Sequence, residues 1–469
     1  MSLAVRLAFL NEGLFHPDEV TLARAVEGTW ERGGLVGAFN GRYGAVLLNL
    51  LLYIPWHWVT GGSAERIVPF SAAVTASLLV ATVYLLSREL YRSRSAALLS
   101  ALFLGFNFLF LSTSTTGKEN THSLFFLAVG LHLLAAGHRK RSLAMRCASF
   151  VPCAVAVTMH EAAVPLLGVH LLYSVCLAVQ RREARRAFAG EVLVGGVLLS
   201  LPVIAYLWPV IAAAATSRGS SSVPTFQGLW SDILPDALHD LVLALGWHVC
   251  ALAAFGLWAA RRHPYETLPL LPWLLLVTYF GNVTTYTPRY LSYLLVPVAL
   301  LAGVGAHRLI ESARSRVGSL LVAAVVLGSV CGYGFWKAYP LLSFRHAYSG
   351  PKRMALWAAA HSESDAVLVT MDASVFYNYY GKRRTENHPV DDGSANQIFV
   401  STLRNMAKKG TKLYIDSTAF TYDRGGYFWT CIGNVFRFQP IGQVVGEGWN
   451  DSELEPDLFI NGFWRLTPR

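Results

Sequence analysis

Residues 66–95 read RIVPFSAAVTASLLVATVYLLSRELYRSRS, and this stretch decides the class of fold. After Arg66 it contains no charged residue until position 88, which gives it the length of about 20 apolar residues that a helix needs to cross a bilayer. It ends in Arg88, Arg92 and Arg94. An apolar stretch of this length that ends in arginines is typical of a transmembrane helix whose end faces the cytoplasm.

Similar apolar stretches recur along the chain, at residues 96–113, 120–137, 146–180, 190–213, 241–260, 266–281, 288–306 and 318–337. The 146–180 stretch is too long for one span, and His160-Glu161 interrupts it, so we interpret it as two helices. The sequence therefore predicts a mostly α, polytopic membrane helical bundle with about ten spans after residue 66.

Composition supports this interpretation. Of the 469 residues, 54% are hydrophobic and only 14% are charged, against roughly 25% in a soluble domain, and the mean hydropathy is +0.40. These values exclude a soluble globular enzyme, a disordered regulator and a disulfide scaffold. The net charge is +10, of which residues 1–337 carry +9. We attribute this excess to cytoplasmic loops and predict no nucleic-acid partner.

The loops alternate in charge, and the alternation predicts the topology. One set is basic, and its cations are Arg88, Arg92, Arg94, Arg139, Lys140, Arg141, Arg146, Arg181, Arg182, Arg185, Arg186, Arg261, Arg262, Arg308, Arg314 and Arg316. The other set is nearly free of cations, so we place it, with the first loop 12–41 and the C-terminal part, on the non-cytoplasmic side of the inner membrane. Counting residues 42–60 as a span would break the alternation, so we interpret them as an interfacial segment.

The two ends of the chain differ in character. Residues 1–10 are apolar but too short to span, and they resemble the tail of a helix whose beginning is absent. Residues 338–469 contain strand-like segments at 365–371, 411–417 and 457–466 and helical patterns at 355–362 and 394–409. The sequence therefore predicts a membrane region, 1–337, and a small external soluble α/β domain, 338–469.

The first segment that could carry chemistry is Phe15-His16-Pro17-Asp18-Glu19, in the first external loop. Proline at the first helical position with two acidic residues in the first turn is ordinary helix-start chemistry, which gives a purely structural explanation. The functional alternative is a carboxylate at the membrane surface that acts as general base toward an acceptor hydroxyl or amine.

This motif also carries a resemblance. HPDE, followed by a helix, a Gly-Gly turn, an Arg-Tyr-Gly segment and the basic turn SRELYRSRS, resembles the GT-C superfamily of membrane glycosyltransferases. The pattern is similar to the protein-mannosyltransferase-like and aminoarabinose-transferase-like branches. The resemblance implies a GT-C-like fold, a polyprenyl-phosphate sugar as donor, Asp18 as the catalytic acidic residue and Glu19 as its partner.

Other candidates for substrate binding lie in the same set of loops. They are His16 beside the acidic pair, Lys118 and Glu119 in TGKEN, the pair His160 and Glu161, and Arg289 and Tyr290 in TPRYL. A guanidinium binds phosphate bidentately, so Arg289 suits the leaving group, with snorkelling to the headgroups as the alternative. Each of these residues also has a purely structural explanation. Glu119 could cap the helix that follows it, Lys118 could be a solvated lysine, and the pair His160-Glu161 could simply face water. No metal-ligand cluster is present, so we predict no metal site, and dependence on a divalent ion stays open.

We therefore expect an enzyme that transfers a sugar from a polyprenyl-phosphate donor to an acceptor on the non-cytoplasmic side, with Asp18 as general base. The lipid-linked sugar is the co-substrate; the other partners are the bilayer and an acceptor that is a protein, a lipid or a glycan. The alternatives are a transporter or flippase, or a polymerase or ligase, of lipid-linked glycans. Transporter sites gather near the bilayer midplane between repeats, whereas the charges here gather at the external ends of helices, without a repeat.

Overall fold

The structure of the chain is a computed structural model that divides into two compact units. Unit 1 holds Met1–Leu10 and Ala25–Ser343, and unit 2 holds Asn11–Arg24 and Phe344–Arg469. The boundary thus falls inside helix α2 (Pro17–Arg32). The residues that the structure describes are 2–36, 42–160, 163–181, 188–199, 242–274, 288–371, 373–388, 393–421, 423, 425–447 and 458–469.

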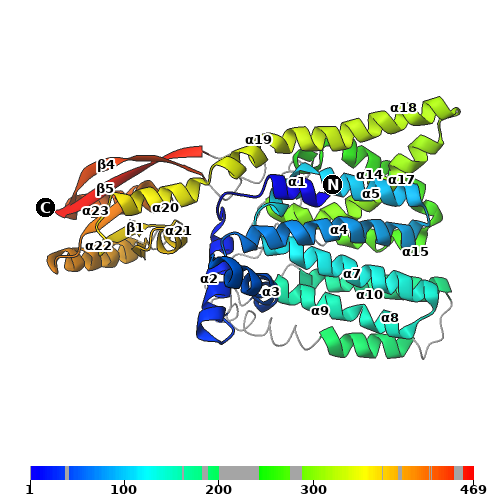
Figure 1. The fold of residues 1–469 in the computed structure, drawn as a ribbon, viewed down its shortest axis with the longest axis horizontal. Coiled ribbons are helices and arrows are strands. Elements are labelled where there is room, and N and C mark those ends of the chain that lie inside the picture. The colour runs from blue at the N-terminus through cyan, green and yellow to red at the C-terminus, as the bar shows by residue number, and fades with distance from the viewer. Residues whose placement is uncertain are drawn as a thin grey trace. The chain divides into compact units, whose positions relative to one another are not determined.

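Unit 1 is a bundle of apolar helices (Figure 1). Within the described ranges, four helices are long and apolar enough to cross a membrane: Ile67–Tyr91 (α4), Glu119–Lys140 (α7), Leu291–Glu311 and Arg316–Ala360. A fifth candidate is a bent pair, α5 (Arg94–Phe106) and α6 (Phe108–Ser114), with 59° between its helices. The predicted polytopic, mostly helical membrane fold is confirmed, while the count of about ten spans stays a prediction.

The break between α5 and α6 has a local cause. Asn107 adopts an extended conformation, and its side-chain oxygen accepts a hydrogen bond from the Phe110 backbone N–H at 3.1 Å. Asparagine at this position ends one helix and caps the next. A similar break occurs where the sequence places one, because α9 (Phe150–Met159) ends just before His160 and α10 (Val164–Arg181) begins after it.

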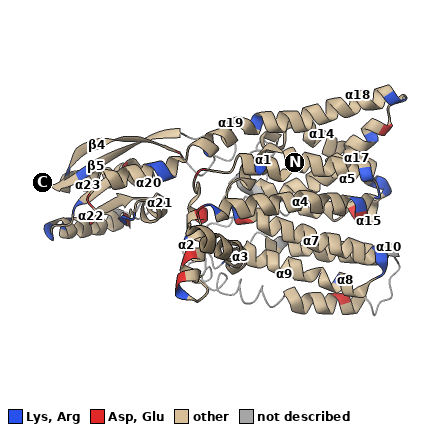
Figure 2. Cartoon of the chain, viewed as in Figure 1, with Lys and Arg blue, Asp and Glu red and all other residues tan. Residues whose placement is uncertain are grey.

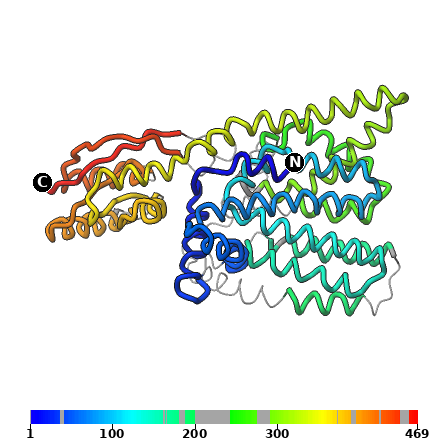
Figure 3. Tube along the Cα trace, in the orientation of Figure 1, coloured from blue at the N-terminus to red at the C-terminus, as the bar shows by residue number. Residues whose placement is uncertain are grey.

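Helix α3 (Tyr43–Thr60) differs in direction from the long apolar helices. Figures 1 and 3 show α3 close to end-on, whereas α4 and α7 run across the same view. A helix that lies across the spanning helices is what an interfacial segment requires. Whether α3 lies in the headgroup region of a membrane stays a prediction.

Two helices of unit 1, α14 (Trp247–Ala259) and α17 (Leu295–Glu311), cross at close range. A methyl group added to Gly256 would lie 1.8 Å from the Leu301 carbonyl oxygen, and one added to Gly305 would lie 2.2 Å from the Leu252 carbonyl oxygen. Only glycine permits this approach of two backbones, as in small-residue contacts of membrane helices generally.

Charge is distributed as the loop pattern predicts. Figure 2 shows lysines and arginines gathered at the turns that follow α4, α7 and α17, at one end of the bundle, while the helices between them are almost free of charge.

The other described elements of unit 1 are α1 (Ser2–Ala8), α8 (Leu143–Ala148), the helix Phe188–Leu199, η4 (Ala260–Arg262), α15 (Pro264–Thr267), η5 (Pro288–Leu294), α18 (Arg316–Leu327), η6 (Gly328–Gly332) and α19 (Tyr333–Ala347), which runs into unit 2.

Unit 2 contains a five-stranded mixed sheet with strand order β2-β1-β3-β5-β4. The strands are β1 (Val367–Thr370), β2 (Arg384–Asn387), β3 (Leu413–Asp416), β4 (Phe436–Glu447) and β5 (Leu458–Pro468). β1 pairs in parallel with β2 and β3, and β5 pairs antiparallel with β3 and β4. The predicted α/β domain is therefore confirmed, and its three predicted strands correspond to β1, β3 and β5.

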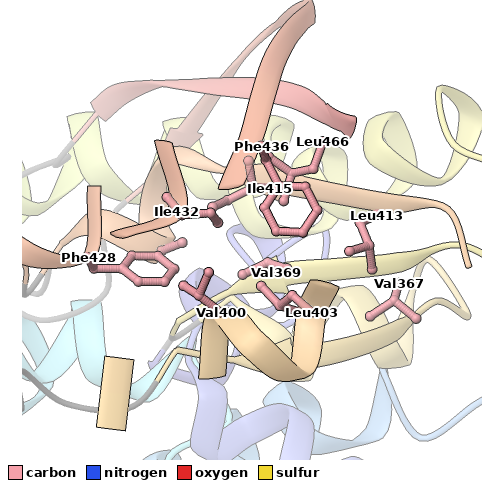
Figure 4. Close-up of a cluster of buried hydrophobic side chains, with 11 residues drawn as sticks. Val367, Val369, Val400, Leu403, Leu413, Ile415, Phe428, Ile432, Phe436 and Leu466 are labelled. Carbon is pink, nitrogen blue, oxygen red and sulfur yellow. The ribbon is translucent and has the colours of Figure 1, made fainter. Parts of the chain in front are cut away.

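Helices cover both faces of this sheet, which is why every residue of β1 and β3 is buried. On one face, α22 (Gly393–Lys408) and α23 (Tyr427–Val435) supply Val400, Leu403, Phe428 and Ile432 to a core with the strands (Figure 4). On the other face, Trp357 of α20 (Gly350–Ala360) packs edge-on against Phe463, with ring centroids 5.5 Å apart. The short elements α21 (Ser374–Tyr379) and η7 (Ser417–Phe420) complete the unit.

Candidate active site

The acidic motif lies at the start of α2, in the part of the helix that belongs to unit 2. His16 is the N-cap residue: its ring Nδ1 accepts a hydrogen bond from the Asp18 backbone N–H at 3.1 Å, and its carbonyl oxygen accepts one from the Glu19 N–H at 3.0 Å. Because Nδ1 is the acceptor, the proton of the neutral ring is on Nε2. Pro17 follows at the first helical position, as the sequence predicts.

The two carboxylates of this motif have different surroundings. Glu19 is 1% exposed, and its Oε2 accepts a hydrogen bond from the Phe15 backbone N–H at 3.0 Å. As in a capping box, a glutamate in the first turn of the helix thus accepts a hydrogen bond from a backbone N–H that precedes the helix. The Asp18 side chain is 17% exposed, with Oδ2 3.6 Å from His16 Nδ1. Of the pair, Asp18 is thus the carboxylate that a substrate in solution can reach.

A second acidic helix start lies in unit 1, at α7. Glu119 is the first residue of α7, and its Oε2 lies 3.1 Å from Nη1 of Arg42, with both side chains only 2% exposed. Lys118, which precedes the helix, is equally buried. The turn before it needs Gly117, because a methyl group there would lie 2.0 Å from Cγ1 of Val68 on α4. The TGKE segment therefore presents a buried, charge-paired cluster.

Below this cluster, polar side chains connect three helices inside unit 1. His122, one turn after Glu119, lies 2.7 Å from the Thr75 hydroxyl and 3.3 Å from the Ser71 hydroxyl. Ser71 in turn donates to Oδ1 of Asn49 on α3 at 2.6 Å. These bonds hold α3 and Arg42 against the start of α7, since polar groups inside a bundle must find partners.

His160 lies close to a third predicted segment. It is buried at the end of α9, and its ring centroid lies 6.1 Å from that of Tyr293 in η5. η5 also packs against α6 and α7. Arg289 and Tyr290 belong to η5 by their backbone, but their side chains lie outside the described part of the structure, and Glu161 lies outside it altogether.

The predicted residues that the structure describes form separate groups in the two units. The structure brings Glu119 together with Arg42, and His160 together with η5, in unit 1, while His16, Asp18 and Glu19 form one helix start in unit 2. Arg42 was not among the predicted site residues, although an arginine beside a long apolar segment was a usable signal. Within the described ranges, no group of three or more His, Cys, Asp or Glu side chains is arranged to hold a metal ion.

Three solved structures have a fold similar to that of this chain. The apo oligosaccharyltransferase of Archaeoglobus fulgidus matches with a TM-score of 0.66 and 12% identity, over 97% of this chain and 75% of that one. ArnT of Cupriavidus metallidurans bound to undecaprenyl phosphate matches at 0.64 and 14%, over 99% and 96%. The arabinofuranosyltransferase AftD of Mycobacteria matches at 0.58 and 14%, over 100% and 39%. The chain therefore has the fold of GT-C membrane glycosyltransferases, as the resemblance implied.

Part of the chain also matches a sequence family. Residues 47–211 match the family described as dolichyl-phosphate-mannose-protein mannosyltransferase. The matched residues include Lys118, Glu119 and His160 and begin after Asp18. No curated protein has a sequence that matches this chain. The prediction of a multi-pass membrane glycosyltransferase is confirmed by the fold and the family match together.

Proposed function

We propose that this protein transfers a sugar from a polyprenyl-phosphate donor to an acceptor on the non-cytoplasmic side of the membrane, with Asp18 as the general base. The observation that carries the proposal is the accessible Asp18 carboxylate beside the buried Glu19, at the start of a helix in a GT-C fold.

The nature of the donor is supported by the relatives. ArnT of Cupriavidus metallidurans has been solved bound to undecaprenyl phosphate, and AglB of Archaeoglobus fulgidus with an inhibitory peptide and a dolichol-phosphate. Both ligands are phosphates on a long isoprenoid chain. The proposal extends this class of ligand to the present chain, where the family matched by residues 47–211 also acts on a lipid-linked mannose by its description.

The reaction follows from the roles of the residues. Asp18 takes the proton of the acceptor hydroxyl or amine, and the resulting nucleophile attacks the anomeric carbon of the sugar. The bond from that carbon to the phosphate oxygen breaks, and polyprenyl phosphate leaves with the electron pair. A positioned base contributes typically about 10²–10⁴-fold to the rate of such a step.

Cations serve the leaving group in this proposal. Lys118 and Arg289 neutralise the phosphate, while Arg42 balances Glu119. If Arg289 binds phosphate with both arms of its guanidinium, Arg289→Ala weakens donor binding by about tenfold to a hundredfold, since hydrogen bonds to charged groups contribute roughly 1.5–3 kcal/mol. Arg289→Lys falls in between. Unchanged donor affinity in Arg289→Ala removes this residue from the proposed site.

The test of the function is direct. Purified protein is incubated with a panel of polyprenyl-phosphate sugars labelled in the sugar, and released polyprenyl phosphate is measured with and without candidate acceptors. Release that depends on the acceptor supports a transferase. Movement of intact donor across proteoliposomes without release would favour a flippase, and transfer only from donors with long glycans would favour a polymerase or ligase.

The proposed side of the membrane has its own test. Cysteines introduced at Gly62 and Ser394 should both react with a membrane-impermeant reagent from the non-cytoplasmic side. The basic turns after α4, α7 and α17 support this proposal, because cytoplasmic loops carry an excess of lysine and arginine. Labelling of the two positions from opposite sides would contradict the proposed topology.

A further inference from the structure

The loop that leads into the acidic motif is bound to the C-terminal part of the chain within unit 2. The Glu12 backbone N–H donates to the Arg345 carbonyl oxygen at 3.0 Å, and the Ser349 N–H donates to Oε2 of Glu12 at 3.0 Å. Two residues further on, the Leu14 N–H donates to the Tyr380 hydroxyl oxygen at 2.8 Å. Three contacts over residues 12–14 therefore fix the path of the loop.

The ring of the next residue, Phe15, packs against the guanidinium group of Arg345. The Arg345 guanidinium carbon lies 3.8 Å from the centroid of the Phe15 ring, and Nε of Arg345 lies 3.4 Å from Oε1 of Glu447. Phe15, Arg345 and Glu447 are all almost completely buried. A desolvated cation is attracted to the face of an aromatic ring, and loss of one partner of a buried ion pair is strongly destabilising.

Phe15 connects Arg345 to the acidic residues at the start of α2. Its ring is fixed by Arg345, and its backbone N–H donates to Glu19, whose own N–H is bonded to His16. A continuous series of contacts thus leads from Glu447 through Arg345 and Phe15 to the first turn of α2, where Asp18 lies.

The tyrosine cluster at 377–380 anchors the same loop. The Tyr377 hydroxyl donates to Oδ2 of the buried Asp416 at 2.5 Å, at the end of β3, whereas Tyr380 accepts from the acidic loop. Two neighbouring tyrosines therefore connect the loop to the sheet of unit 2.

We infer that Arg345 is a positioning residue for the glycosyl transfer: through the Phe15 ring it holds the start of α2 so that Asp18 meets the acceptor in a reactive position. This inference rests on the proposed function. It gives the C-terminal domain a part in the reaction, since the domain fixes the direction of the catalytic carboxylate. A misplacement of about 1 Å is enough to lower the rate about a hundredfold.

The experiment compares two equal truncations in the same unit. Phe15→Leu keeps an apolar side chain but removes the aromatic face under Arg345. Phe436→Leu makes the same change in the sheet core, where Phe436 is fully buried. Both variants are purified as the full chain, and the unfolding midpoint, kcat and KM for donor and acceptor are measured at a temperature where both remain folded.

The expected result is a split between the two variants. Both lose stability, but only Phe15→Leu shows a kcat lowered by tenfold or more with a KM near that of the wild type. If kcat is equal in the two variants, Arg345 and Phe15 serve only stability and the inference is wrong. Should Phe15→Leu fail to fold, Tyr380→Phe removes a single acceptor from the loop and must also lower kcat, by a smaller factor.

A second measurement separates this inference from the proposed function. Hydrogen exchange of the Asp18, Glu19 and Val20 amides, which are bonded to His16, reports on the helix start without any reaction. These amides should exchange faster in Phe15→Leu than in Phe436→Leu. If the wild type releases no polyprenyl phosphate but the exchange differs, the function fails and the positioning stands; equal exchange overturns the positioning.

Discussion

Helices α2 and α7 both begin with acidic residues, but the surroundings of these residues differ. α2 begins with Asp18 and Glu19 in unit 2, and α7 begins with Glu119 in unit 1. Local sequence gives both the same explanation, because a carboxylate in the first turn offsets the positive end of the helix dipole. The two helix starts differ in the surroundings of their carboxylates in the folded protein. Glu119 is buried against Arg42, whereas Asp18 keeps 17% of its side chain exposed.

The difference teaches that a carboxylate's availability, and not its position on a helix, indicates its role. A buried carboxylate with a guanidinium 3.1 Å away is committed to that partner, because breaking the pair would leave an uncompensated charge. An accessible carboxylate at a rigid helix start can accept a proton and release it again. The comparison therefore favours a structural role for Glu119 and supports the proposed chemical role of Asp18, and the predictions below test this division.

The largest effect is expected for Asp18→Asn. Asparagine keeps the shape of the side chain and its ability to lie at a helix start but removes the basicity, so kcat should fall about 10²–10⁴-fold. Expression, membrane insertion and the unfolding midpoint should remain those of the wild type. Turnover near that of the wild type in this variant would end the assignment of Asp18 as the base.

The next effect concerns stability at the other helix start. Arg42→Met leaves Glu119 buried without its guanidinium, and Glu119→Gln leaves Arg42 without its carboxylate, so each should lower the free energy of unfolding by about 3–5 kcal/mol. The double variant should lose less than the sum, because no charge is then left unpaired. Unfolding in detergent measures this, with the exposed Glu31→Gln on α2 as a control that should change little. Additive losses would show that the pair does not interact.

A smaller effect distinguishes the two carboxylates of α2. Glu19→Gln keeps an oxygen that accepts from the Phe15 N–H, so its kcat should fall far less than that of Asp18→Asn. Glu19→Ala removes the acceptor and should lower the free energy of unfolding by about 1 kcal/mol, the usual magnitude for a lost cap. Measurements of kcat and of the unfolding midpoint for both variants test these two expectations. A rate loss in Glu19→Gln as large as that in Asp18→Asn would reverse the assigned roles.

The smallest effect concerns Asp416, a buried carboxylate at the end of β3. Hydroxyls of Tyr377 and Thr418 donate to it, but burial raises its pKa above the ordinary value of 3.8. The folded state then binds the proton more tightly than the unfolded state, so the free energy of unfolding falls as the pH rises from 3.8 through the folded-state pKa. Asp416→Asn should remove this decline, which unfolding midpoints measured across the acidic range would reveal.

The control for this experiment is Asp365→Asn, an exposed aspartate at the start of the same unit's first strand region. It should leave the acidic decline as it is in the wild type. A decline that survives in Asp416→Asn would mean that another group is responsible for it.

The sequence predicted most of the membrane region because its physics is local. Apolar length and loop charge locate helices such as α4 and α7 without knowledge of any contact. In unit 2 the buried strands β1 and β3 were equally visible, since helices on both faces make them mostly apolar. β4 was missed because Pro440 and Gly442 interrupt its pattern, at the point where its register with β5 shifts.

The site was predictable only in part, for a related reason. Asp18 and Glu19 were visible as a motif, but which of them is accessible depends on the bond from Phe15 to Glu19. Arg42 and Arg345 were missed as partners because Glu119 and Phe15 lie far from them along the chain. Long-range pairs of this kind leave no periodic trace in a single sequence.

The two outer strands of the sheet also govern how copies of this protein behave beside one another. Proteins in a membrane are confined to a plane, where open strand edges meet often and tend to pair. β4 carries Pro440, which has no N–H to offer, and an irregular register, while β2 is four residues long and carries Arg384 and Glu386. Proline, irregularity, shortness and charge each hinder edge-to-edge pairing. The domain can therefore be crowded in the plane of the bilayer without its sheets joining into aggregates.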